Sequence, residues 1–140
     1  HVALWHAMSI LREHRGDGAV AVLMAAELSG IEALVSHTAT GNGFVTEFAR
    51  ASRGYRRQEW DATVARLAGR GVLDDRGGLT EQGTALRRQV EADTDRLGAG
   101  PWSHLGAEDA ARLGELGGKL VAALLDAGCY PEGIRPAPPR

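Results

Sequence analysis

Apolar residues recur every three or four positions along most of the chain, and glycine-rich or polar stretches interrupt them. This spacing places the apolar side chains on one face of a helix, so the pattern predicts a mainly α-helical protein. The interruptions divide the chain into helices predicted over residues 2–14, 19–28, 31–40, 47–52, 57–70, 81–97 and 107–127.

Capping residues support several of these boundaries. Asp17, in the turn between the first two segments, is a suitable N-cap for the second helix. Ser29 is followed three residues later by Glu32, a capping-box spacing that predicts the start of the third helix. Thr46 is a predicted N-cap for the fourth helix, and Thr80 for the sixth. Gly71 follows the fifth helix, where a glycine with left-handed backbone ends many helices.

A short hairpin is predicted after the fifth helix. Residues 72–74 and 79–80 read as two brief strands, and Asp75–Gly78 between them reads as a tight turn. In the helix before the hairpin, Trp60, Val64 and Leu67 share one face and are expected in the core, with Phe48 across the turn as their partner. Two helices joined by a turn and followed by a small hairpin form the plan of a winged helix-turn-helix.

The predicted fold class is therefore mainly α: a winged helix-turn-helix with a short two-stranded wing, embedded among flanking helices. We expect four segments along the chain. They are N-terminal helices that pack on the core (residues 1–44), the winged helix-turn-helix (45–97), a C-terminal helix with a possible role in dimerisation (98–130) and a flexible tail (131–140).

Positive charge is concentrated in the helix-turn-helix segment. The chain carries a net charge of −2, whereas residues 50–70 contain six arginines and two acids. A basic segment on an acidic body is typical of a small DNA-binding face. Chance clustering is the alternative, because arginine supplies nearly all the basic residues of this chain.

The wing region resembles that of MarR-type transcription regulators. In those proteins a strand led by glycine is followed by a polar turn and by a Leu-Thr-x-x-Gly-x-x-Leu element, which stands here as Leu79, Thr80, Gly83 and Leu86. The resemblance covers about 50 residues. The wider chain, with Leu4-Trp5-His6 and Pro101-Trp102, is similar to the C-terminal part of a longer protein of an actinobacterial helix-turn-helix family, and no activity accompanies that similarity.

The resemblance implies transcription regulation through double-stranded DNA. Base edges are read by Arg, Lys, Asn or Gln, and only Gln58 and Arg66 lie on or beside the outward face of the predicted recognition helix. Phosphate contacts are expected from four arginines at the turn and the wing: Arg53, Arg56, Arg57 and Arg76. The wing tip also carries Asp74 and Asp75, which phosphates would repel.

Two other readings stay open. The first is a winged-helix domain without DNA binding, serving as a small-molecule-binding or protein-interaction module. MarR-like proteins often sense small molecules beside the DNA-binding helices, so the resemblance also implies an effector. Its candidate contacts in this chain are Trp5, His6, Met24 and Trp102. The second is that these four residues pack in the hydrophobic core and do not bind an effector.

Catalysis and cofactors have no support in the sequence. The histidines show no metal-ligand spacing, Cys129 is the single cysteine, and no nucleophile motif is present, so we expect no enzyme, no metal and no cofactor. No apolar run is long enough for a membrane span, and a cytoplasmic location is expected by default. A leucine stripe near the C-terminal end makes a homodimer possible.

Overall fold

The structure is a computed structural model that describes residues 2–129, and all regular elements in this range are helices. They are α1 (Val2–Ala25), α2 (Gly30–Thr38), α3 (Thr46–Ser52), α4 (Arg57–Gly69), α5 (Glu81–Gly98), α6 (Gly100–Leu105) and α7 (Ala107–Asp126). The mainly α prediction is confirmed. The chain divides into two compact units, residues 1–97 and 98–140. The predicted tail, residues 131–140, lies outside the described residues.

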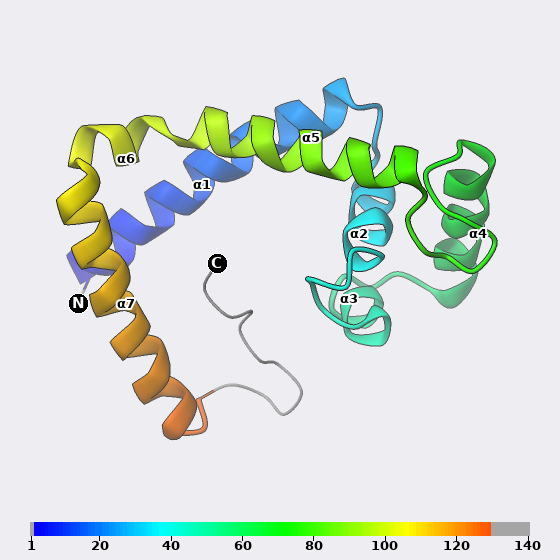
Figure 1. Cartoon of the computed structure of the whole chain (residues 1–140). Helices are drawn as coiled ribbons and strands as arrows, with labels where there is room; N and C mark the ends of the chain where they lie inside the picture. The colour runs from blue at the N-terminus through cyan, green and yellow to red at the C-terminus, as the bar shows by residue number, and fades with distance from the viewer. Residues whose placement is uncertain (1, 130–140) are drawn as a thin grey trace. The chain divides into compact units, whose positions relative to one another are not determined.

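The hydrophobic core of the first unit lies where α2, α3 and α4 meet. These helices gather at one end of the unit, and α5 leads away from the hairpin that follows α4 (Figure 1). Leu67 of α4 and Val35 of α2 are almost fully buried there. Ala49 is the buried residue of α3, whereas Phe48, the predicted partner of Trp60, is half-buried and stacks on Phe44. The prediction that Trp60 and Leu67 face the core is confirmed.

The first two predicted helices are one continuous helix, so the predicted turn over residues 16–18 is wrong. Neither Gly16 nor Gly18 has a positive φ, and α1 runs through both. A Cβ added at Gly18 would lie 3.1 Å from Cβ of Leu97 on α5, so the glycine allows α1 and α5 to approach closely. Helix α1 ends instead before Glu27, whose backbone is left-handed with φ 54°.

The predicted two-stranded wing is also wrong, because the hairpin contains one isolated antiparallel bridge, Leu73–Leu79, and no strand among the described residues. The bridge cannot extend into a longer pair of strands, because α5 begins at Glu81, two residues after Leu79. The Asp74 carboxylate closes the turn itself: its Oδ1 accepts hydrogen bonds from the backbone N–H groups of Arg76 and Gly78, both at 2.8 Å.

The Leu-Thr-x-x-Gly-x-x-Leu element fastens the hairpin to α5. The Thr80 hydroxyl oxygen accepts the backbone N–H of Gly83 at 2.9 Å, as predicted for an N-cap, and the hydroxyl donates to the carbonyl of Gly71. At Gly83 the helix touches the chain that leaves α4: an added Cβ would lie 2.0 Å from the carbonyl oxygen of Val72. A side chain therefore does not fit at position 83.

The smaller boundary predictions had mixed outcomes. Gly71 has φ +72°, which confirms it as the left-handed residue after α4. Thr46 is the first residue of α3 and Val45 is its N-cap, so the predicted cap is wrong by one position. The short helix α6 was not predicted.

The second unit contains α6 and α7 within the described residues. Pro101 stands in the first turn of α6, where its missing N–H costs nothing. On α7 the predicted leucine stripe is only partly covered, with Leu116 and Leu120 exposed and Leu113 and Leu124 half-buried.

No single helix among residues 2–129 combines the length and the apolar composition that a membrane span requires. Taken together, α1 and α2 meet these criteria, with a bend of 97° between them.

The two glycines in α1 give a matched prediction. Gly16→Ala should raise the free energy of unfolding by about 0.5–1 kcal/mol, because alanine favours the helix and nothing lies within 4 Å of the new methyl group. The free energy of unfolding of the Gly18→Ala variant should be about 1 kcal/mol lower than that of the Gly16→Ala variant, because the new methyl group at position 18 crowds Leu97. Urea unfolding of both variants measures the difference, and equal stabilities would contradict the close approach of α1 and α5.

Position 83 gives a second prediction. Gly83→Ala should lower the free energy of unfolding by about 1–3 kcal/mol, because the backbone of the hairpin must move away from α5. Gly69→Ala is the control, since a Cβ at Gly69 meets nothing within 4 Å, and its stability should be unchanged or slightly higher. Thermal unfolding of the two variants compares them; a Gly83→Ala protein as stable as the control would refute the contact.

Candidate nucleic-acid interface

The turn between α3 and α4 is held by reciprocal hydrogen bonds. The backbone N–H of Tyr55 donates to the carbonyl of Arg50 at 3.1 Å, and the Arg50 guanidinium donates back to the carbonyl of Tyr55 at 3.0 Å. Between them Gly54 has φ +73°, a conformation that suits glycine. These contacts fix the angle between the two helices of the motif.

Helix α4 presents one buried and one exposed face. Trp60, Thr63 and Leu67 are buried against the rest of the unit. The opposite face is exposed and carries Gln58, Ala62, Ala65 and Gly69. This face is the one that a recognition helix would turn toward the major groove, and Gln58 is its one residue suited to base readout.

Two of the predicted DNA-contacting arginines are paired with acids. The Nε of Arg56 lies 3.1 Å from Oε2 of Glu59, and the same oxygen accepts the backbone N–H of Arg56, which caps α4. The side chain of Arg66 donates to the hydroxyl of Thr63 at 2.8 Å and lies 3.7 Å from Glu32 of α2. Arg66 therefore leans toward α2 and away from the outward face.

The other three predicted arginines make no ion pair within residues 2–129. Arg57, in the first turn of α4, and Arg76, at the hairpin tip, are exposed and line one hollow of about 370 Å³. Three carboxylates line the same hollow, so its charge is mixed: Glu47, Asp61 and Asp75. Arg53 lies elsewhere, on a groove beside α2 together with Tyr55.

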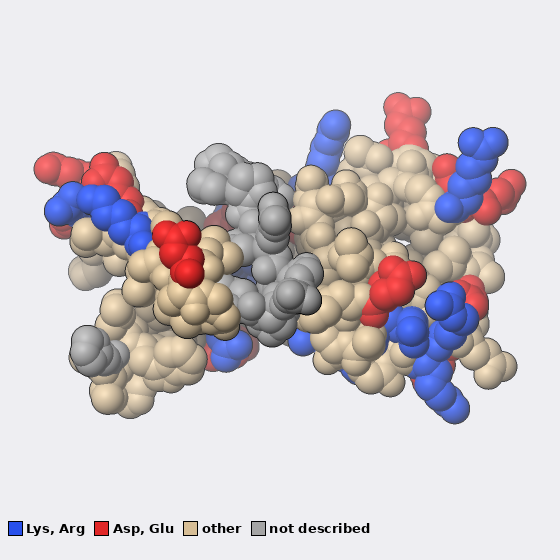
Figure 2. All heavy atoms as spheres, turned by 90° about the horizontal axis from the view of Figure 1, so that it is seen from below, with Lys and Arg blue, Asp and Glu red and all other residues tan. Residues whose placement is uncertain are grey.

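Positive and negative side chains are mixed on the molecular surface seen in Figure 2. On the face seen in Figure 2, arginine side chains and acidic side chains lie beside one another rather than in separate patches. The ion pairs of Arg56 with Glu59 and of Arg66 with Glu32 also reduce the free positive charge around α4. The surface available to a phosphate backbone is therefore small.

Glu32 is a site residue that the sequence indicated only as a helix cap. Its carboxylate is buried and accepts the hydroxyl of Ser29 at 2.6 Å and the backbone N–H of Ser29 at 3.0 Å. Arg70 lies 3.5 Å from it and also donates to the carbonyl of Glu27 at 3.0 Å. The hydrogen bonds from Ser29 lower the pKa of Glu32, and the charges of Arg70 and Arg66 act in the same direction against burial.

The residues predicted to bind an effector are spread out. Trp5 and Met24 are both exposed on α1, about 28 Å apart at the rise of an α-helix. His6 is also exposed on α1, and Trp102 belongs to the second unit. Their role in binding stays a prediction. In the part of the chain that the structure describes, no three His, Cys, Asp or Glu side chains gather as metal ligands would.

The helix pair, its fixed turn and the hairpin against α5 define a helix-turn-helix domain. A family model described as a helix-turn-helix family matches residues 1–131, and the chain belongs to that family. No match was found among curated proteins or among solved structures. Domains of such families typically bind DNA and are not catalytic, so DNA is the partner that family membership suggests.

The buried carboxylate gives a pH prediction. Because the pKa of Glu32 is lowered in the folded state, its ionised form stabilises the fold above pH 4.5, and this contribution disappears as the pH falls through the lowered pKa. Glu32→Gln should therefore lower the free energy of unfolding by about 1–3 kcal/mol at neutral pH.

Urea unfolding across the acidic range measures this effect, and the loss caused by Glu32→Gln should shrink as the pH falls below 4.5 and through the lowered pKa. Glu13→Gln is the control, since that exposed carboxylate pairs only with its neighbour Arg12 in the described part of α1 and should change stability little. A loss at Glu32 that is the same at all pH values would show that its charge does not matter.

Proposed function

We propose that the chain binds double-stranded DNA through α3, the turn and α4, as part of a transcription regulator of the MarR-like type. Arg57 and Arg76 are the observation that carries the proposal. Both are exposed, both lack an ion pair within residues 2–129, and both line one hollow among α2, α3, α4 and the hairpin tip. A duplex seated on α4 would bring a phosphate to each of them.

The hairpin tip suits this role better than its acids suggest. The carboxylate of Asp74 is turned into the hairpin, where it accepts the backbone N–H groups of Arg76 and Gly78. This leaves Asp75 as the outward acid of the tip and holds Arg76 at its end. Arg57 stands in the first turn of α4, where free backbone N–H groups and the helix dipole also favour an anion.

Sequence readout is proposed to be weak. Gln58 is the polar side chain on the outer face, and Arg66 must leave Glu32 and Thr63 before it reaches a base edge. Arg56 remains mostly exposed despite its pairing with Glu59, so it is proposed as a third phosphate contact. Arg53 is assigned to the groove beside α2. Dimerisation through α7 stays a prediction.

The alternative is a winged-helix domain that does not bind DNA. The pairing of Arg56 and Arg66 with acids favours it, because these pairs remove two of the charges that a phosphate contact needs. The side chains on the exposed face of α4 are also small and uncharged at Ala62 and Ala65. Such a surface suits contact with another protein as well as contact with a groove.

Fluorescence anisotropy with a random-sequence duplex tests the proposal. Between about 50 mM and about 200 mM salt the affinity should fall by about tenfold to a hundredfold, as expected for two to four phosphate contacts. Arg57→Ala and Arg76→Ala should each weaken binding and reduce the logarithmic salt slope by about 1.

Arg12→Ala is the control, because Arg12 is also an exposed arginine but lies on α1, so its loss should leave the affinity unchanged. Lack of binding by a folded protein at low salt would reject the regulator function for this chain and favour the protein-interaction alternative. Binding that all three variants share would place the DNA on a different surface.

A further inference from the structure

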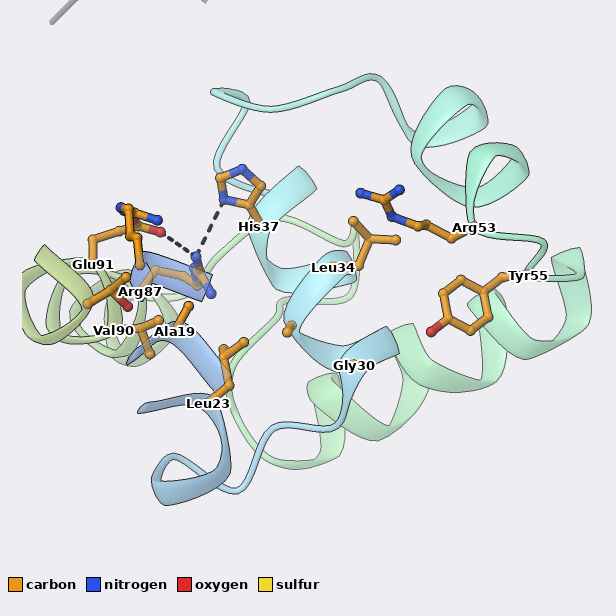
Figure 3. A pocket seen from close by; sticks show the side chains of 13 residues that line it. Ala19, Leu23, Gly30, Leu34, His37, Arg53, Tyr55, Arg87, Val90 and Glu91 are labelled. Atoms are coloured by element: carbon orange, nitrogen blue, oxygen red, sulfur yellow. Dashed lines mark hydrogen bonds and ion pairs between the residues drawn. The ribbon is translucent and has the colours of Figure 1, made fainter. Parts of the chain in front are cut away.

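A groove of about 630 Å³ lies beside α2 in the first unit, and its lining is unlike that of the hollow at α4. Leu23 of α1, Leu34 of α2 and Val90 of α5 supply apolar walls. Arg87 of α5 lines one part of it, while Arg53 and Tyr55 project from the α3–α4 turn on the other side of α2 (Figure 3). A groove of this size and mixed lining is typical of small-molecule sites.

Arg87 is the unusual residue of this groove. It is 6% exposed, although arginine is almost never buried without full pairing. Its Nη2 donates to Oε1 of Glu91 at 2.7 Å and lies 3.4 Å from Nδ1 of His37. Its Nε has no hydrogen-bond partner, and it is the one buried side-chain nitrogen or oxygen of residues 2–129 in that state. Burial lowers the pKa of Arg87, and Glu91 opposes that effect.

The charge of the groove is not balanced. Arg15, Arg53 and Arg87 line it, and Glu91 is the one carboxylate among the lining residues. Glu91 is shared, because Arg15 lies 3.6 Å from its second oxygen while Arg87 binds the first. Arg15 is also paired with Asp95 outside the groove at 3.0 Å. One further negative charge in the groove would therefore be stabilised.

The far side of the groove offers a hydrogen-bonding group. Tyr55 is half-buried, and within residues 2–129 its hydroxyl makes no hydrogen bond to the protein. Gly30 stands opposite: a Cβ placed there would lie 3.7 Å from the Tyr55 hydroxyl oxygen. This hydroxyl can donate a hydrogen bond to a ligand group in the groove or accept one from it.

We propose that this groove binds an amphipathic organic acid, with its carboxylate on Arg87 and its apolar body over Leu34 and Val90 toward Tyr55. A carboxylate oxygen can accept the Nε–H that has no other partner, and a single negative charge limits repulsion by Glu91. The apolar walls require a hydrocarbon body and disfavour inorganic anions. This site differs from the predicted contacts Trp5, His6, Met24 and Trp102, and it does not depend on DNA binding.

Octanoate is the first probe, and the N–H signal of Arg87 Nε in ¹H–¹⁵N NMR spectra is the readout. Octanoate should shift that signal saturably, with a dissociation constant of about 1 mM or tighter. Octan-1-ol, which lacks the charge, should bind at least about tenfold more weakly. The titration needs neither DNA nor a variant, so its result is independent of the proposed DNA binding.

Arg87→Met separates binding from folding. Replacement of a buried and incompletely paired charge by an apolar chain of similar length should leave the stability equal or higher. The variant should nevertheless lose octanoate affinity by about tenfold or more, measured by calorimetry. Arg88→Met is the matched control, since Arg88 is the exposed neighbour on α5 and should keep the wild-type affinity.

The far end of the groove is tested with 8-hydroxyoctanoate. It should bind more tightly than octanoate, and Tyr55→Phe should abolish that gain while octanoate affinity stays unchanged. The proposal is overturned if octanoate gives no saturable shift at about 10 mM, if octan-1-ol binds as well, or if Arg87→Met binds like the wild type. A failure of Arg87→Met to fold leaves the wild-type titration as the deciding measurement.

Discussion

The buried carboxylate of Glu32 is the interaction on which the first unit depends. It receives both hydrogen bonds of Ser29 at the start of α2, and it faces Arg66 in the last turn of α4 and Arg70 at its C-cap. Arg70 reaches on to the carbonyl of Glu27, where α1 ends. Three helices thus meet at one charge, and the orientation of α4 follows from it. The same contact holds Arg66 away from the outer face, so the domain gains stability at the expense of a base-reading side chain.

The second constraint is the contact between the hairpin and α5. Thr80 caps α5 and binds the carbonyl of Gly71, while Gly83 lies against the carbonyl of Val72. This explains physically why threonine and glycine occupy these positions: one supplies a cap and the other supplies space. The wing can therefore be very short, since α5 and the Asp74 carboxylate support it in place of a strand ladder.

Local signals in the sequence predicted much of the fold. The capping residues Ser29 and Thr80, the left-handed Gly71 and the buried face of α4 each depend on a few neighbouring residues. The errors arose where distant segments decide. From the sequence alone Gly18 predicts a turn, whereas in the structure it makes room for Leu97 of α5. Residues 72–80 have the pattern of two strands, but α5 begins at Glu81 and leaves too few residues for the second strand.

The residues of the candidate sites also divide into those that local sequence signals could indicate and those that depend on distant segments. Arg57 and Arg76 stand near the predicted motif, so the sequence could indicate them. Arg87 could not be found, because it looks like an ordinary surface arginine in a charged helix. Its burial follows only from the assembly of α1, α2 and α5 around it. The ion pairs of Arg56 and Arg66 were likewise invisible in a count of charges.

Helix α5 has a mechanical consequence. It is one uninterrupted helix of 18 residues, about 27 Å long, with the hairpin clamped at its first turn and Arg87, Val90 and Glu91 farther along. An uninterrupted helix moves as a stiff lever, so a tilt caused by filling the groove would displace the hairpin tip, where Arg76 stands, as a rigid body. Ligand binding in the groove and a shift of the hairpin tip would then both accompany the same rotation of α5.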